Sequence, residues 1–211
     1  MSDTIGIEDI GRMIRSAADK IRANRDGLSK LDSAIGDGDH GTTIARAMTI
    51  AEKHIEESDK KDLKGLLKDV GWGVMGVDGG ATGPLLGSFL MGLSNGIGEE
   101  NEIDSSSVAA MFEAGLAGVR RQSKAQVGDK TMMDALLPAI DAIRQSIDAG
   151  KSIKQALQNA AEAAEKGAVS TKEFKARFGR ARNLGDRTIG FQDPGATSIA
   201  LIFDGFYEGV Q

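Results

Sequence analysis

Apolar residues recur every three or four positions along most of the chain, which is the spacing of one buried helix face. No segment alternates convincingly between apolar and polar residues, as a half-buried strand would. The pattern therefore predicts an all-α fold, a bundle or barrel of eight helices. The apolar stripes cover residues 7–21, 44–55, 63–74, 85–93, 108–119, 132–147, 153–164 and 199–206.

Polar residues and prolines mark where several of these helices begin. Asp104 or Ser105 can cap one helix, and Ser152 can cap another, because their side-chain oxygens accept from free backbone N–H groups. Pro84 and Pro194 each suit the first position of a helix, where the N–H that proline lacks has no partner. These residues predict the starts of four helices.

Length and composition indicate one helical domain over residues 1–211, because no linker or block of charge divides the chain. The chain has no Cys, no N-terminal signal pattern and no apolar run of the length that spans a membrane, so we expect a soluble, cytoplasmic protein without a membrane partner. The net charge is −5, and the aromatic residues are few: one Trp, one Tyr and seven Phe. Nucleic acid is therefore not expected as a partner.

Three carboxylates, Asp32, Asp37 and Asp39, fall within eight residues. Gly36 and Gly38 lower the cost of unusual backbone angles there, so the loop can aim the three acids at one point. Such convergence is unfavourable unless a cation offsets the repulsion, and oxygen ligands without Cys suit a hard ion such as Mg²⁺ or Ca²⁺. The alternative is a solvated turn in which an aspartate caps the next helix.

The spacing of these acids does not fit an EF-hand calcium loop. Counted from Asp37, the fifth, sixth and twelfth positions hold Gly41, Thr42 and Met48, where that loop needs an acid or amide, a glycine and a glutamate. Mg²⁺ usually shares its ligand sphere among a few carboxylates, water and phosphate oxygens. The cluster therefore favours Mg²⁺ and a phosphorylated ligand.

Two further segments are candidate binding sites for an anion. Residues 77–84 are small and lead into a predicted helix start, whose free N–H groups favour a phosphate or ribose; close helix packing is the alternative explanation. Four arginines occur within the eleven residues 177–187. One of them, Arg180, is a candidate phosphate ligand, and a solvated basic loop is the alternative.

Four motifs together carry a resemblance to a known family. Residues 36–41 (GDGDHG), 79–84 (GGATGP), 128–132 (GDKTM) and 192–198 (QDPGATS) resemble, in this order, the nucleotide-binding L subunit of dihydroxyacetone kinases. The resemblance extends from about residue 32 to residue 198. It implies a barrel of eight antiparallel helices with the nucleotide at one end.

The resemblance also implies a set of site residues. Asp32, Asp37 and Asp39 would hold two Mg²⁺ ions that grip the phosphates of ADP or ATP, and Arg180 would offset negative charge during phosphoryl transfer. Ser123 stands where the family has a glycine, and Arg182-Asn183 replaces a Ser-Tyr pair, so an erythrulose-type or other short-chain ketose kinase stays open. The residues implied to line the nucleotide site are His40, Gly41, Thr42, Thr43, Ala81, Thr82, Ser123, Met132, Arg180, Asp193, Pro194 and Gly195.

The resulting hypothesis is a phosphotransferase subunit that delivers a phosphoryl group to a hydroxyl of a short-chain ketose. The resemblance implies that a separate K subunit holds the ketose. ADP is either recharged by a phosphohistidine-carrying M subunit or exchanged for ATP. A non-catalytic protein that senses Mg²⁺-nucleotide and regulates a partner is the alternative from another class, and a fatty-acid kinase ranks last.

Overall fold

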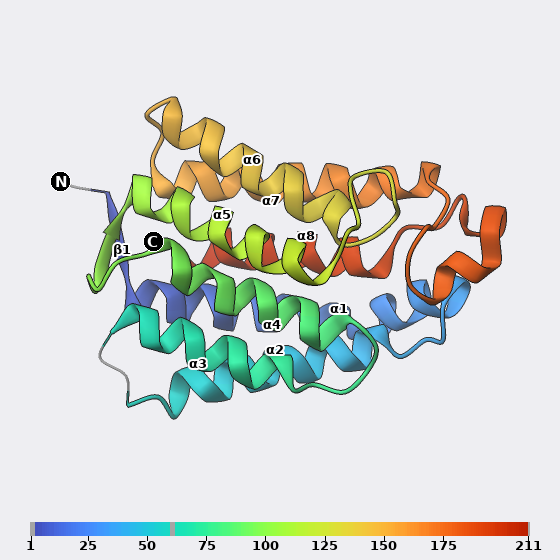
Figure 1. Cartoon of the computed structure of the whole chain (residues 1–211), viewed down its shortest axis with the longest axis horizontal. Coiled ribbons are helices and arrows are strands. Elements are labelled where there is room, and N and C mark those ends of the chain that lie inside the picture. Colours follow the sequence, from blue (N-terminus) through green and yellow to red (C-terminus); the bar gives the residue numbers. More distant parts are fainter. Residues whose placement is uncertain (1–2, 60–61, 211) are drawn as a thin grey trace.

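The computed structural model describes residues 3–59 and 62–210, and within them the predicted all-α fold with eight α-helices is confirmed. Figure 1 shows these helices side by side along the long axis of the molecule. They are α1 (Ile7–Ile35), α2 (His40–Glu56), α3 (Leu63–Met75), α4 (Thr82–Leu93), α5 (Ser105–Gln122), α6 (Met133–Asp148), α7 (Ile153–Ser170) and α8 (Pro194–Gly209).

The helices form a closed ring. Each helix packs on the next one in the sequence, and α8 packs on α1 to complete the circle. Because consecutive helices run in opposite directions, every second connection lies at the same end of the bundle (Figure 1). The connections 36–39, 76–81, 123–132 and 171–193 therefore gather at one end, and these connections contain most of the four motifs that carry the family resemblance.

Two local features differ from the sequence prediction. Strand β1 (Thr4–Gly6) pairs antiparallel with β2 (Glu102–Asp104), a ladder too short to leave a period-two pattern in the sequence. The prediction that Pro84 is the first residue of its helix is wrong by two positions, because α4 begins at Thr82. A third-position proline costs little, since the N–H groups of the whole first turn lack helical partners.

The other predicted helix starts are confirmed. Of the two candidates for α5, Asp104 is the cap, and its carboxylate accepts from the N–H of Ser107. The side chain of Ser152 caps α7, and the side chain of Asp193 caps α8, directly before Pro194. A capping side chain of this kind typically contributes about 1 kcal/mol.

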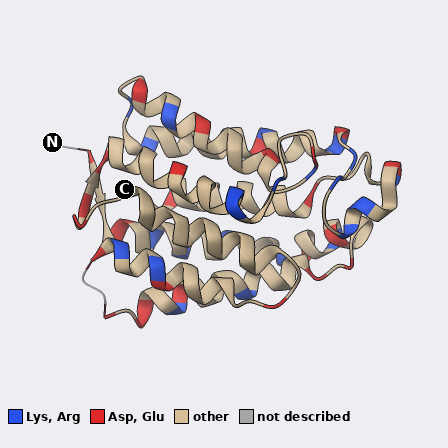
Figure 2. Ribbon diagram, in the orientation of Figure 1, with Lys and Arg blue, Asp and Glu red and all other residues tan. Residues whose placement is uncertain are grey.

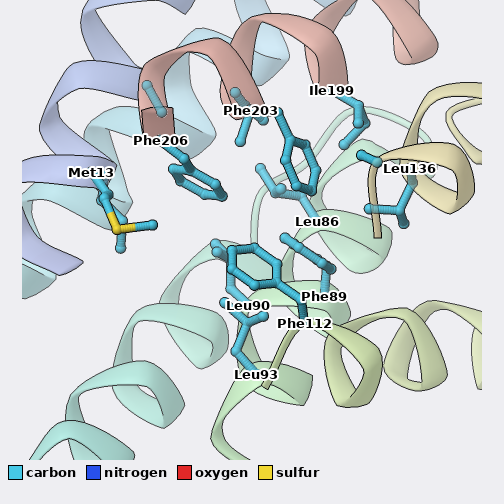
Figure 3. Close-up of a cluster of buried hydrophobic side chains, with 14 of the residues drawn as sticks. Met13, Leu86, Phe89, Leu90, Leu93, Phe112, Leu136, Ile199, Phe203 and Phe206 are labelled. Atoms are coloured by element: carbon cyan, nitrogen blue, oxygen red, sulfur yellow. The ribbon is translucent and has the colours of Figure 1, made fainter. Parts of the chain in front are cut away.

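Aromatic residues from three helices form the centre of the core (Figure 3). Phe203 and Phe206 of α8 meet Phe89 of α4 and Phe112 of α5, with ring centroids 5.7 to 6.4 Å apart. All four side chains are buried. Elsewhere the backbones approach directly: a Cβ on Gly205 of α8 would overlap the Cα of Ala17 on α1, so only glycine permits this helix contact.

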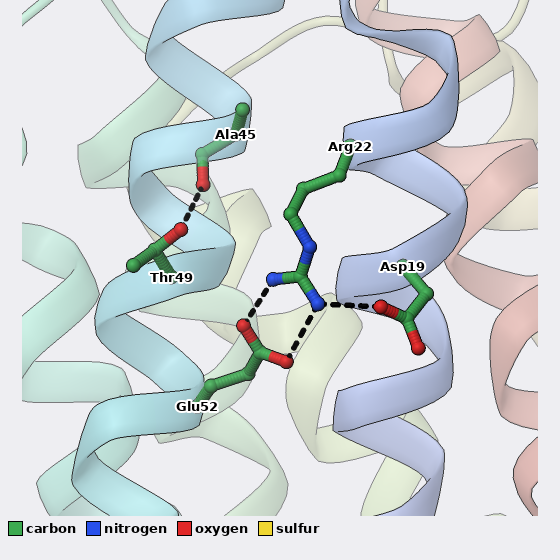
Figure 4. A network of polar contacts seen from close by, with 5 residues as sticks. All are labelled: Asp19, Arg22, Ala45, Thr49 and Glu52. Carbon is green, nitrogen blue, oxygen red and sulfur yellow. Dashed lines mark hydrogen bonds and ion pairs between the residues drawn. The ribbon is translucent and has the colours of Figure 1, made fainter.

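Charged residues lie on the outer faces and in the connections of the bundle (Figure 2). On one such face Arg22 of α1 contacts Glu52 of α2 and Asp19 of its own helix (Figure 4). Exposed pairs of this kind contribute at most about 1 kcal/mol, so the buried side chains dominate stability. None of the described helices combines the length and the apolar character needed to cross a lipid bilayer.

Candidate functional site

The four connections at one end of the bundle surround a cavity of about 330 Å³. Its polar part includes Asp32, Asp39, Arg180 and Asp193. Its apolar part is lined by Leu85, Leu86, Val119, Met132, Met133 and Ile199. A cavity lined by both charged and apolar side chains suits a ligand that has both a charged group and a flat or apolar group.

The structure brings the three predicted carboxylates together at this end. Asp32 lies in the last turn of α1, Asp37 lies in the connection, and Asp39 directly precedes α2. One oxygen of each lies within 4.8 Å of the others. Three hard oxygen donors at this separation, without sulfur or imidazole ligands, fit Mg²⁺.

Two backbone features fix the carboxylate of Asp32. The backbone N–H of His40 donates to Asp32 Oδ2 over 3.2 Å. The other oxygen, Oδ1, lies so close to Gly36 that a Cβ on this glycine would overlap it. Any residue with a Cβ at position 36 would therefore push the Oδ1 oxygen of Asp32 out of this position.

Replacement of Gly36 by alanine is expected to displace the Asp32 carboxylate and to weaken Mg²⁺-dependent ADP binding about tenfold, as when the support of a metal ligand is lost. The measurement is calorimetric titration with ADP in Mg²⁺. The matched control is Gly27→Ala, a position where a new Cβ meets no atom within 4 Å. Equal weakening in both variants would contradict the explanation.

Arg180 reaches the carboxylates from the connection between α7 and α8. Its Nε lies 3.1 Å from Asp37 Oδ2, and its Nη1 would lie 3.1 Å from a Cβ on Gly80. A different arginine of this stretch, Arg177, pairs with Asp129 over 3.4 Å. Arg180 thus lies between the acidic cluster and the start of α4, where it can contact a phosphorylated ligand.

The ring of His40 lies between α4 and α8. Its Nε2 is 3.1 Å from Ser198 Oγ, and its Nδ1 is 3.3 Å from Thr82 Oγ1. Burial lowers the pKa of the His40 imidazole, although Asp32 and Asp39 nearby act in the opposite direction. The lowered pKa favours the neutral ring at neutral pH.

The structure places the other predicted site residues in two groups. Ala81, Thr82, Ser123, Met132, Asp193, Pro194 and Gly195 line the cavity together with His40 and Arg180. Gly41, Thr42 and Thr43 are not among its lining residues. Gly41 instead lies against α1, where a Cβ would overlap the carbonyl of Arg25, and buried Thr43 packs against Gly79.

Among the lining residues that sequence reasoning did not select are Lys130 and Ser198. Both lie inside motifs that carry the family resemblance, which was the available signal. Lys130 is 2% exposed, and its ammonium group donates to the carbonyls of Thr171 and Phe191. It thereby joins both ends of the connection that carries Arg180 to the connection between α5 and α6.

Buried charges surround Lys130. Burial lowers the pKa of Lys130, while Asp193 and Asp134 raise it. Burial also raises the pKa of Asp134, whose carboxylate accepts from the N–H groups of Gly128 and Thr131. Burial raises the pKa of Asp193 to about 7, against the hydrogen bond from Ala196 N, which lowers it. These side chains form one polar cluster beneath the cavity.

The raised pKa of Asp193 predicts a pH dependence of stability. An unfolded chain loses this proton near pH 4, about the ordinary pKa of aspartate, whereas the native protein keeps it until about pH 7. Between these values the native state binds more protons, so its free energy of unfolding falls as the pH rises, by at most about 1.4 kcal/mol per unit.

The test is urea unfolding of the native chain and of Asp193→Asn at pH 5 and at pH 7. Asparagine also caps helices and does not titrate, so the variant is expected to lose less stability over this interval. Equal pH dependence of the two proteins would exclude Asp193 as the titrating group.

The sequence of this chain is similar to one protein family and to several named proteins. Residues 34–208 match the DAK2 domain family. The chain is 36% identical over 192 residues to the Listeria innocua protein named PEP-dependent dihydroxyacetone kinase 1, ADP-binding subunit DhaL, and the match covers 91% of each chain. It is 33% identical over 197 residues to the L-erythrulose kinase of Pectobacterium atrosepticum, covering 92% of this chain and 33% of that protein.

Solved structures show the same fold. The crystal structure of the dihydroxyacetone kinase from C. freundii in complex with AMP-PNP and Mg²⁺ matches with a TM-score of 0.70 and 25% sequence identity. The match covers 94% of this chain and 33% of that chain.

Proposed function

Because this chain belongs to the DAK2 domain family, we propose that it is the ADP- or ATP-binding subunit of a dihydroxyacetone-type kinase. The observation that carries the proposal is that Asp32, Asp37 and Asp39 converge with Arg180, and that Asp32, Asp39 and Arg180 line one cavity. The name of the Listeria relative and the AMP-PNP and Mg²⁺ of the C. freundii complex support ADP or ATP as the nucleotide and Mg²⁺ as the metal.

Different residues of the site would bind the metal, the phosphates and the adenine ring. Asp32, Asp37 and Asp39 would hold two Mg²⁺ ions, and bound Mg²⁺ supplies positive charge that offsets the phosphates. The start of α4 has no side-chain cap and lines the cavity with Ala81 and Thr82, so its N–H groups can donate to phosphate oxygens. The apolar part of the cavity suits the adenine ring.

Arg180 is the residue placed to assist the transfer itself. The terminal phosphoryl group leaves the oxygen of the bound nucleotide and forms a bond to a hydroxyl oxygen of the ketose, whose proton passes to a base. During this transfer, the guanidinium of Arg180 can offset the negative charge that spreads over the phosphoryl oxygens. We assign the ketose and the base to a separate K subunit.

The proposal also names the phosphoryl donor and the ketose that accepts the phosphoryl group. The Listeria relative is named PEP-dependent, which supports recharging of bound ADP by a phosphohistidine-carrying M subunit rather than exchange with free ATP. Dihydroxyacetone is the proposed ketose. Erythrulose is the second candidate, because the chain is also similar to L-erythrulose kinase.

Exposed apolar side chains around the cavity support docking of a partner at this end. Val127, Val169, Phe178, Ile189 and Phe191 are between 37% and 49% exposed. Val127 lies between α5 and α6, Val169 lies in the last turn of α7, and the other three lie between α7 and α8. Apolar groups that surround a site in this way are typical of an interface that closes over the ligand.

The activity test combines the chain with K and M subunits, phosphoenolpyruvate and its phosphotransfer proteins, and either dihydroxyacetone or erythrulose. We expect transfer to dihydroxyacetone. Activity only with free ATP would contradict the M-subunit route, and preference for erythrulose would contradict the proposed ketose. ADP binding without transfer under every condition would favour a regulatory protein instead.

Two variants separate the roles of residues in this assay. Arg180→Ala is expected to lower kcat at least about tenfold, because it removes a charge that acts on the transferring group. Arg187→Ala, an exposed arginine of the same connection outside the cavity lining, is the control. Ile189→Glu is expected to weaken association with the K subunit and to leave ADP binding unchanged. Gln158→Glu, at an exposed residue in the first half of α7, which begins at the opposite end of the bundle, is the control for Ile189.

A further inference from the structure

Both ring nitrogens of His40 are engaged by the protein itself. Nε2 meets Ser198 Oγ on α8, and Nδ1 meets Thr82 Oγ1 on α4. Neither nitrogen is therefore free to bind a ligand while these contacts persist.

The partners determine which nitrogen carries the proton. The hydroxyl of Ser198 donates to the carbonyl of Gly195 over 2.9 Å, so its oxygen can only accept from the ring. Nε2 must then be the donor, and in a ring that carries this single proton Nδ1 accepts the hydroxyl proton of Thr82.

The backbone of the same residue connects these helices to the acidic cluster. His40 is the first residue of α2, it follows Asp39 directly, and its N–H donates to Asp32 Oδ2. Its ring holds Thr82 and Ser198, in the first and second turns of α4 and α8. One residue thus connects the carboxylates with both helix starts that face the cavity.

We propose that His40 is a positioning residue: its ring, which donates from Nε2 to Ser198, fixes the starts of α4 and α8 relative to the carboxylates. It acts on a nucleotide through Thr82 and Ser198 and not through its own ring nitrogens. This role rests on the proposed function, because it concerns the same cavity. The assignment of the proton does not depend on that function.

The first test is ¹⁵N NMR of the imidazole in the protein without nucleotide at neutral pH. The chain has two histidines, so His54→Gln leaves His40 as the only imidazole signal. His54 does not line the cavity. We expect Nε2 to resonate as a protonated nitrogen and Nδ1 as an unprotonated one. Protonation on Nδ1, or averaging of the two signals by exchange, would overturn the assignment.

The second test uses variants that keep one nitrogen at a time. A glutamine amide can replace the Nε2 donor, and an asparagine oxygen can replace the Nδ1 acceptor, whereas His40→Phe replaces neither. We expect His40→Phe to weaken Mg²⁺-ADP binding about tenfold, as for the loss of about 1.4 kcal/mol. His40→Gln and His40→Asn should each recover part of the affinity, a rescue that a purely space-filling ring would not show.

A double-mutant cycle tests whether the ring acts through its partner. Ser198→Ala removes the acceptor on α8 without changing His40. If the ring acts through Ser198, this change costs affinity in the native background and little more in the His40→Phe background. Fully additive losses, or binding by His40→Phe within about twofold of the native chain, would overturn the positioning role.

The outcomes separate this inference from the proposed function. Absence of Mg²⁺-ADP binding by the native chain would contradict the proposed function and the positioning role together, and the NMR measurement would still decide the tautomer. Binding by the native chain with an unaffected His40→Phe variant would overturn the positioning role alone.

Discussion

Replacement of Asp39 by asparagine is expected to weaken ADP binding in Mg²⁺ about 100-fold, equivalent to about 2.8 kcal/mol. The change keeps the size of the side chain and removes one of three negative charges that lie within 4.8 Å of one another. A neutral amide is a poor substitute for an ionised ligand of a hard cation. The measurement is calorimetric titration of each protein with ADP at fixed Mg²⁺.

The fold should tolerate this substitution, so the effect is specific to the site. Asp39 precedes α2, but its side chain makes no capping hydrogen bond there. The loss of one charge also relieves repulsion among the carboxylates when no metal is bound. Asp78→Asn, an exposed acid in another connection at the same end, is the matched control. Native affinity in Asp39→Asn would show that this carboxylate does not bind the metal.

Replacement of Phe203 by alanine is expected to lower the free energy of unfolding by about 3–5 kcal/mol. Its side chain is fully buried and meets the rings of Phe89, Phe112 and Phe206, so truncation leaves a cavity where three helices join. Urea unfolding measures the change. Ile189→Ala, at a side chain that is 49% exposed, should cost less than about 1 kcal/mol. A similar small loss in Phe203→Ala would contradict the central position of this ring.

The helices could be predicted from the sequence because their buried faces repeat with the helical period. The second half of α1 shows why some boundaries could not. Few apolar residues mark residues 22–35, yet the helix continues to Ile35, and only Leu28 and Ile35 in this part are buried apolar side chains. The β1–β2 ladder also depends on contact between segments about 100 residues apart, which local periodicity does not record.

The candidate site, too, could be predicted from the sequence only in part. Asp32, Asp37 and Asp39 are close in sequence and separated by glycines, so their convergence could be predicted from local chain geometry. The contact between His40 and Ser198 joins residues 158 positions apart. Lys130 likewise meets carbonyls on a distant connection, so its burial and role depend on how α6, α7 and α8 pack.

The central claim is that the three aspartates hold Mg²⁺ and that Mg²⁺ holds the diphosphate of the nucleotide. Calorimetric titration of the native chain and of Asp37→Asn with ADP, each with and without Mg²⁺, tests it most directly. The account expects strong binding only for the native chain in Mg²⁺, because the other three titrations lack the metal or one of its ligands. Equal affinity in all four titrations would contradict it.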